Sequence, residues 1–115
     1  MQVPNMLKRK SNISHVDSYK AFLDVLSSTD KVIVDFYSDN CGPCRQIKPK
    51  LDDMSVQIPN IKFIKVNIDI VPDLADRMGI YGVPTFHFYN KGVLEKTVVG
   101  ADLKKVKEAV EALQG

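Results

Sequence analysis

The sequence predicts an α/β protein in which a mixed sheet of about five strands is flanked by about four helices, as a three-layer α/β/α sandwich. Runs of β-branched and aromatic residues alternate along the chain with segments whose apolar residues recur at helical spacing. Near the C-terminus two strand-like runs are separated only by a short turn that contains glycine, which predicts an antiparallel hairpin. A chain of 115 residues is expected to form one domain with its own core.

The first half of the chain has signals for two strands and two helices. Residues 11–14 are expected to form a short edge strand. From Val16 to Leu26 apolar residues recur at helical spacing, which predicts a helix. The continuous β-branched run Lys31–Tyr37 has turn residues on both sides and is typical of a buried strand. A second helix is expected after Cys41, with Pro49 inside it.

The second half continues the alternation and ends in a helix. Ile61–Ile68 has the pattern of a strand, and Val71–Met78 that of a short helix that begins near a proline and stops at a glycine. Thr85–Tyr89 and Val93–Val98 are the two strands of the expected hairpin. Asp102 is suited to cap a final amphipathic helix.

The charge and hydropathy of the chain favour neither nucleic-acid nor membrane binding. The cluster Lys8–Lys10 holds three of the 16 basic residues, so the remainder, with its 14 acidic residues, is close to neutral. No run approaches the roughly 18 apolar residues of a membrane span. Residues 1–10 are expected to be a mobile extension and 11–115 the folded domain. We expect a cytoplasmic location, because cysteines kept together as one pair fit a reducing compartment; a short organellar presequence is the alternative.

The chain contains only two cysteines, Cys41 and Cys44, which follow the Lys31–Tyr37 strand. Two thiols at this spacing can close a small disulfide ring, and a helix N-terminus favours the thiolate that attacks disulfides. A strand, this pair and then a helix therefore predict thiol–disulfide exchange. A zinc half-site is one alternative, but zinc takes four ligands, and His15 and His87 stand alone. An inert structural disulfide is another, but so small a ring stabilises a protein little.

The two cysteines are expected to divide the work of the exchange. Cys41, at the outer start of the helix, is expected to be the more exposed and to attack the substrate disulfide. Cys44, one turn further on, is expected to be more shielded and to resolve the resulting mixed disulfide. Gly42 and Pro43 hold the ring tight, since a proline early in a helix costs little.

Asp35 is an acid in the middle of an apolar strand. Burial would raise the pKa of its carboxyl, which could then take a proton from Cys44 as that thiol attacks. The alternatives for Asp35 are a partner in an ion pair and an acid that reaches solvent at the end of the strand.

From about Ser11 to Leu113 the chain resembles the thioredoxin family in an ordered set of motifs with matching spacings. The motifs are Val34-Asp35-Phe36, Cys-Gly-Pro-Cys at 41–44, Pro49, Lys65-Val66-Asn67-Ile68-Asp69, Gly82-Val83-Pro84-Thr85, Gly92 and Val99-Gly100-Ala101. The resemblance implies the thioredoxin fold and a protein disulfide reductase that is re-reduced by an NADPH-dependent thioredoxin reductase. It also implies a monomer, electron transfer to proteins such as peroxiredoxins, and no cofactor or metal besides the cysteine pair.

The resemblance assigns roles to individual residues as well. Asp35 matches a buried proton-transfer group and Lys65 its partner lysine, so both join the cysteine pair as expected catalytic residues. Pro84 matches a cis-proline that lies against the cysteines and leaves the backbone of Val83 free to pair with an extended substrate. The expected substrate-binding and tuning residues are Asn40, Gly42, Pro43, Val83, Pro84, Thr85 and Gly100.

Asn40 departs from the family, because most members carry tryptophan before the first cysteine and this chain has no tryptophan. The change removes apolar area from the docking surface and should alter the choice of partner, while the exchange chemistry stays intact. Two other functions are therefore considered. One is a thioredoxin-fold interaction module with vestigial or regulatory cysteines, and the other is a dedicated electron donor for one partner.

Overall fold

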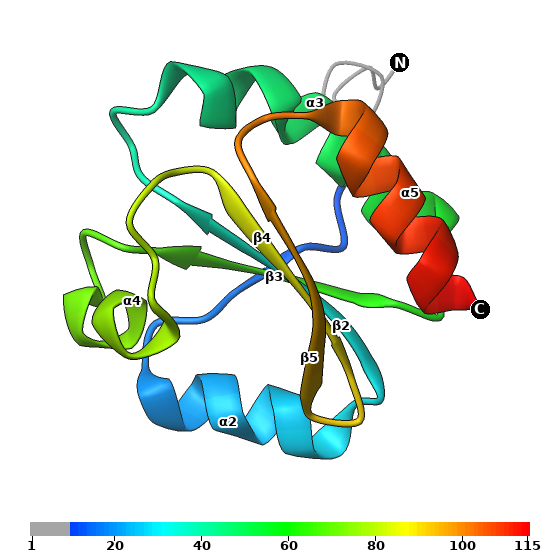
Figure 1. Cartoon of the computed structure of the whole chain (residues 1–115), viewed down its shortest axis with the longest axis horizontal. Coiled ribbons are helices and arrows are strands. Elements are labelled where there is room, and N and C mark those ends of the chain that lie inside the picture. The colour runs from blue at the N-terminus through cyan, green and yellow to red at the C-terminus, as the bar shows by residue number, and fades with distance from the viewer. Residues whose placement is uncertain (1–9) are drawn as a thin grey trace, which may run out of the picture.

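The computed structural model describes residues 10–115, so nearly all of the predicted extension at 1–10 lies outside the described residues. Within the described part the chain forms five strands and four helices in the predicted order (Figure 1). In chain order the elements are β1 (Ser14–His15), α2 (Tyr19–Ser28), β2 (Lys31–Tyr37), α3 (Gly42–Gln57), β3 (Lys62–Asn67), α4 (Pro72–Met78), β4 (Thr85–Asn90), β5 (Val93–Val99) and α5 (Leu103–Gln114).

The strands form one mixed sheet in the spatial order β1-β3-β2-β4-β5. β3 pairs in parallel with both β1 and β2, as expected of strands that are joined through helices. β4 pairs antiparallel with β2 and with β5, and β4 and β5 are the predicted hairpin. The predicted mixed sheet is thus confirmed, and the cysteine pair follows its central strand, β2.

Helices cover both faces of the sheet, with α3 and α5 on one face and α2 and α4 on the other (Figure 1). The buried apolar side chains accordingly form two cores, one on each face. Side chains alternate along β2, so Ile33 joins the core under α3 and α5, while Val32 and Val34 join the core under α2 and α4. By the same alternation Asp35 points to the face that α3 covers.

The first helix begins later than the apolar pattern predicted. Val16 continues the path of β1, and its N–H donates to the C=O of Lys65 at 3.0 Å. α2 then begins at Tyr19, because the Ser18 hydroxyl accepts a hydrogen bond from the N–H of Ala21 at 3.1 Å and so caps the helix. The later elements agree with the prediction to within one or two residues, the usual uncertainty of element ends.

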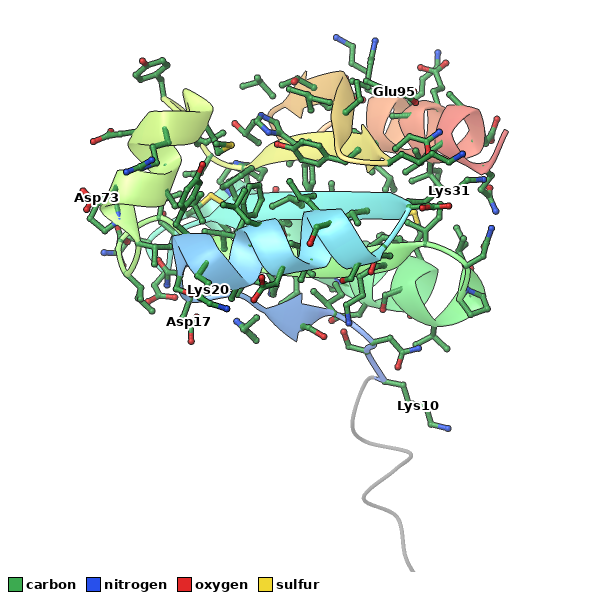
Figure 2. The ribbon with its side chains drawn as sticks, turned by 90° about the horizontal axis from the view of Figure 1, so that it is seen from below. Lys10, Asp17, Lys20, Lys31, Asp73 and Glu95 are labelled. Atoms are coloured by element: carbon green, nitrogen blue, oxygen red, sulfur yellow. A yellow bond between two sulfur atoms is a disulfide. The ribbon has the colours of Figure 1, made fainter. Side chains whose placement is uncertain are left out.

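Many charged side chains lie on the outside of the layers, whereas Asp35, Asp52 and Lys65 are buried. Figure 2 shows Lys10, Asp17, Lys20, Lys31, Asp73 and Glu95 at the periphery of the molecule. Among residues 10–115, no helix has the length and apolar character needed to cross a lipid bilayer.

Candidate active site

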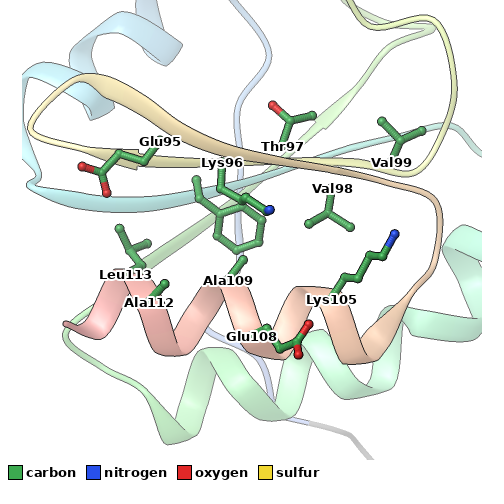
Figure 3. A pocket seen from close by; sticks show the side chains of 11 residues that line it. Glu95, Lys96, Thr97, Val98, Val99, Lys105, Glu108, Ala109, Ala112 and Leu113 are labelled. Atoms are coloured by element: carbon green, nitrogen blue, oxygen red, sulfur yellow. The ribbon is translucent and has the colours of Figure 1, made fainter.

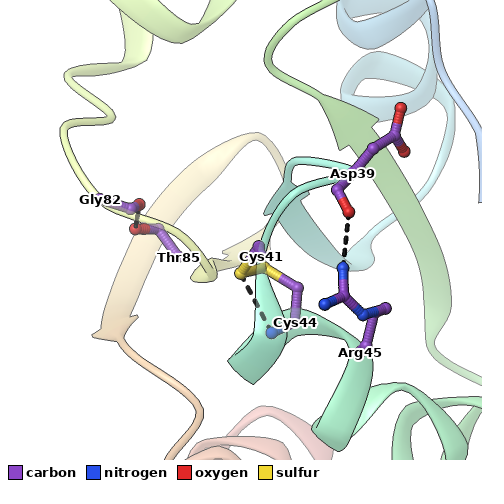
Figure 4. The surroundings of a disulfide bond; sticks show 6 residues. All are labelled: Asp39, Cys41, Cys44, Arg45, Gly82 and Thr85. Atoms are coloured by element: carbon purple, nitrogen blue, oxygen red, sulfur yellow. Dashed lines mark hydrogen bonds between the residues drawn. A yellow bond between two sulfur atoms is a disulfide. The ribbon is translucent and has the colours of Figure 1, made fainter.

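Cys41 and Cys44 form a disulfide at the N-terminus of α3, with their Cα atoms 5.2 Å apart (Figure 4). Cys41 is the N-cap residue, and its Sγ accepts a hydrogen bond from the N–H of Cys44 at 3.1 Å. Pro43 occupies one of the first helical positions, where its missing N–H would have no helical partner. The structure therefore places a closed cysteine pair at the positive end of a helix dipole.

The sequence predicted that Cys41 is more exposed than Cys44, and the structure differs from this prediction. Cys41 is 5% exposed and Cys44 is 7% exposed, so Cys41 is not the more exposed of the two in the disulfide form. The Cys41 Sγ faces the first turn of α3, where it accepts a hydrogen bond from the N–H of Cys44. Cys44 in turn lines a cavity of about 300 Å³ on the β2 side of α3.

Asp35 lies in the wall of the same cavity as Cys44. It is 7% exposed, and within residues 10–115 its Oδ1 atom has no hydrogen-bond partner. Burial raises the pKa of Asp35 from 3.8 to about 7; the positive charge of Lys65 lowers it and the negative charge of Asp52 raises it further. The prediction of a buried acid is confirmed, and near neutral pH this carboxyl can both accept and release a proton.

Lys65 pairs with Asp35 in the register of β3 against β2, and both residues are buried. The Lys65 ammonium lies over the ring of Tyr37, 4.7 Å from its centroid. Within the described part of the chain Asp35 and Lys65 are not in direct ion-pair contact. Lys65 therefore acts on Asp35 through the field of its charge, and its contact is with the aromatic ring.

A loop before β4 faces the disulfide (Figure 4). The Val83–Pro84 peptide bond is cis, as the resemblance implied. The Thr85 hydroxyl donates to the C=O of Gly82 at 2.6 Å, and the N–H of Gly100 donates to the C=O of Pro84 at 2.7 Å. Gly100 has a φ of 95°, which a residue with a side chain rarely adopts, so a glycine is needed there.

Asn40 is exposed in the loop before Cys41. The C=O of the neighbouring Asp39 accepts a hydrogen bond from Nη1 of Arg45 at 2.7 Å (Figure 4). Arg45 thus fastens this loop to the first turn of α3. Reasoning from the sequence missed Arg45, because a surface arginine after the second cysteine carries no signal of its own.

The two histidines differ in burial. His87 is buried, its Nδ1 lies 3.1 Å from the Tyr89 hydroxyl, and its ring packs on Phe36. Burial lowers the pKa of His87. His15 is exposed on β1. Among residues 10–115, no three or more His, Cys, Asp or Glu side chains are grouped so as to hold a metal ion.

A larger cavity of about 520 Å³ lies between β5 and α5 (Figure 3). Its lining includes Val98, Ala109 and Leu113, with Lys96 and Glu108 at the rim, and no cysteine or histidine. The groups that carry thiol chemistry are all at the other site, at the start of α3. We therefore take the surroundings of the disulfide as the candidate active site.

A family model, curated proteins and solved structures are similar to this chain. The family model described as Thioredoxin matches residues 13–112. A thioredoxin of Streptomyces clavuligerus is 42% identical over 88 residues, which are 76% of this chain and 80% of that protein. Thioredoxin-2 of Pyricularia oryzae is 37% identical over 103 residues, 90% of this chain, which spans only 60% of that protein. One solved structure concerns the thiol resolving mechanism in yeast mitochondrial 1-Cys peroxiredoxin via glutathione/thioredoxin systems. A chain in that structure superposes on this chain with a TM-score of 0.84 and 26% identity, over 87% of this chain and 94% of that one.

Proposed function

The chain belongs to the thioredoxin family, and on that basis we propose that it reduces disulfides in other proteins and is itself re-reduced by an NADPH-dependent thioredoxin reductase. Family membership together with the Cys41–Cys44 pair makes it a thiol–disulfide oxidoreductase. The observation that carries the proposal is the closed cysteine pair at the start of α3, beside a cavity that also contains a buried carboxyl.

The proposed reaction transfers two electrons from the reduced cysteine pair to the substrate. The Cys41 thiolate attacks a substrate disulfide, and the first substrate sulfur leaves as a thiolate that takes up a proton. Cys44 gives its proton to the carboxylate of Asp35 and attacks the Cys41 sulfur, and the second substrate sulfur leaves as a thiolate that takes up a proton from water. The substrate is then a dithiol and the Cys41–Cys44 disulfide is formed. Lys65 is proposed to stabilise the Asp35 carboxylate through its nearby charge.

The loop opposite the disulfide is proposed to bind an extended substrate segment. Within residues 10–115 the backbone N–H and C=O of Val83 have no hydrogen-bond partner, so both are available to a substrate strand. Exposed apolar side chains lie around this loop, since Tyr81 is 93% exposed and Val99 is 67% exposed. Gly82 lies close to Val99, since a Cβ atom at Gly82 would be 4.0 Å from the Val99 side chain. The end of β5 is therefore beside the loop. The proposed substrate-binding and tuning residues remain Asn40, Gly42, Pro43, Val83, Pro84, Thr85 and Gly100.

The proposed partners are thioredoxin reductase and disulfide-containing proteins such as peroxiredoxins. Similarity to a chain in the structure on yeast mitochondrial 1-Cys peroxiredoxin supports a peroxiredoxin substrate. We propose a monomer that binds neither nucleic acid nor membrane and is located in the cytoplasm. An organellar location is the alternative, and fractionation of cells that express the full chain distinguishes the two.

Insulin reduction in the presence of dithiothreitol tests the reductase activity. The protein should accelerate precipitation of the insulin B chain over dithiothreitol alone, and the Cys41→Ser variant should not. An inactive wild-type protein would favour an interaction module with regulatory cysteines. A panel of thioredoxin reductases and substrates then tests recycling: several active pairs support a general reductase, and a single active pair supports a dedicated donor.

A further inference from the structure

Three polar side chains on α3 share one face of the helix. Cys44, Lys48 and Asp52 are spaced four residues apart, and residues at this spacing lie above one another. This face is turned toward the sheet, because Cys44 is 7% exposed and Asp52 is 2% exposed. Cys44 and Lys48 line the cavity of Asp35, and the charge of Asp52 acts on Asp35 as well. The Cys44 thiol therefore lies on the same helix face as the charged side chains of Lys48 and Asp52, next to the buried Asp35.

Lys48 and Asp52 form an ion pair in which only the acid is buried. The Lys48 Nζ lies 2.9 Å from Asp52 Oδ2, and the two side chains are 55% and 3% exposed. A buried carboxylate needs a partner, and within residues 10–115 the ion-pair partner of Asp52 is Lys48. The ammonium of Lys48 is thus engaged by Asp52, although Lys48 also lines the cavity in which the Asp35 Oδ1 has no hydrogen-bond partner among the described residues.

We propose that Lys48 and Asp52 are a positioning pair for proton transfer between Asp35 and Cys44. Asp52 holds the Lys48 ammonium away from Asp35, and Lys48 neutralises the Asp52 carboxylate. The pair itself adds no net charge to the helix side of the cavity, so Asp35 stays able to exchange a proton near neutral pH. This inference rests on the proposed function, and neither residue is assigned contact with the reacting sulfurs.

Two substitutions in the Lys48–Asp52 pair should shift the titration of Asp35 in opposite directions. In Asp52→Asn a negative charge is lost and Lys48 is released, so the carboxylate of Asp35 is favoured and its titration should move down by about one pH unit. In Lys48→Met the stem is kept but the Asp52 charge is no longer neutralised, so the titration of Asp35 should move up by a similar amount. A purely structural role would not move the two variants in opposite directions.

The other titratable groups around Asp35 stay the same in these variants. They are His15 on β1, Tyr37 on β2, Lys65 on β3, Asp39 in the loop before the cysteines and Arg45 on α3. A shift in titration is therefore attributable to the Lys48–Asp52 pair.

The experiment follows the carboxyl carbon of Asp35 by NMR over pH in the disulfide form of the full chain. In the reduced form, the pH profile of mixed-disulfide resolution should shift in the same direction for each variant. The matched control is the other lysine–aspartate pair at this spacing, Lys20 and Asp24 on α2, which lie 3.0 Å apart with side chains 86% and 64% exposed. Lys20→Met and Asp24→Asn should leave the Asp35 titration within about 0.2 pH units of wild type, because charges at the surface are screened.

The outcomes separate this inference from the proposed function. Opposite shifts in Asp52→Asn and Lys48→Met support the pair, whereas no shift in either variant, or shifts of the same sign, overturns it. Lys48→Gln is a second neutral variant, whose amide can still donate a hydrogen bond to the buried Asp52 carboxylate, and it should also shift the Asp35 titration upward. A wild-type protein that fails to reduce insulin would overturn the proposed function, while the NMR titration would still decide on the pair.

Discussion

Replacement of Asp35 by asparagine is expected to raise the stability of the disulfide form relative to wild type as the pH rises from about 4 to about 7. Burial raises the pKa of Asp35 from 3.8 to about 7, so the folded protein holds this proton to a higher pH than the unfolded chain. The stability that the neutral carboxyl supports is fully present below about pH 4 and is lost as the pH rises to about 7. At about 1.4 kcal/mol for each pH unit, the loss amounts to roughly 4 kcal/mol.

Asparagine carries no charge at any of these pH values, so the variant lacks this loss. Among residues 10–115 the Oδ1 atom of Asp35 has no hydrogen-bond partner. The buried amide of the asparagine lowers the free energy of unfolding by a constant of about 1–3 kcal/mol where its polar atoms lack hydrogen bonds. That cost does not vary with pH. The pH-dependent part of the difference between the two proteins therefore reports on the carboxyl alone.

Urea unfolding near pH 4 and near pH 8 measures this difference. The free energy of unfolding of Asp35→Asn, relative to wild type, should rise by about 4 kcal/mol between the two pH values. The closed disulfide keeps the cysteines from titrating. Asp24→Asn is the control, because the Asp24 side chain is 64% exposed, and its effect should change by less than about 0.5 kcal/mol. An effect of Asp35→Asn that is the same at both pH values would refute a buried acid that is protonated near neutral pH.

Three further substitutions test the division of labour and the docking surface. Cys44→Ser should trap mixed disulfides between Cys41 and substrate proteins, because the resolving thiol is absent; stable adducts on Cys44 in a Cys41→Ser variant, detected by mass spectrometry, would reverse the two roles. Asn40→Trp should lower the apparent KM for protein disulfides several-fold, since a buried interface aromatic contributes roughly 1–3 kcal/mol. A changed pH profile of Cys41 alkylation with an unchanged KM would instead place residue 40 in the surroundings of the thiol. Tyr81→Ala should raise the KM for insulin and leave the rate with a small aromatic disulfide unchanged, and equal effects on both substrates would exclude a docking role for this exposed ring.

The order of the elements could be predicted because each element has a signal in its own residues. The run Lys31–Tyr37 was predicted as a strand with the bounds that the structure has, since β-branched residues and flanking turns define it locally. The start of α2 was wrong by a turn, because Val16 is apolar at helical spacing yet belongs to the path of β1. Its hydrogen bond to Lys65 joins residues far apart in the sequence, and no local pattern contains it.

The candidate site likewise has features that the sequence predicts and features that depend on contacts between distant segments. The strand pattern left open whether Asp35 is buried or reaches solvent. The family resemblance implied a buried acid and a cis bond before Pro84, and both are confirmed. The similar burial of the two cysteines was not predicted, because it depends on how segments far apart in the sequence pack around the start of α3. The placement of Lys65 over Tyr37 depends likewise on how side chains pack between strands.

The position of Asp35 explains why one carboxyl can take part in both halves of the proposed cycle. Its backbone is opposite Phe86 in the centre of the sheet, where an apolar side chain would make the fold more stable. A carboxyl there destabilises the protein, but burial also brings its pKa to about 7, so that both protonation states are populated at neutral pH. The ionised form can take the proton of Cys44 during resolution, and the neutral form can return it when the reductase reopens the disulfide. An acid with an ordinary pKa could do only the first of these steps well, and an apolar residue neither.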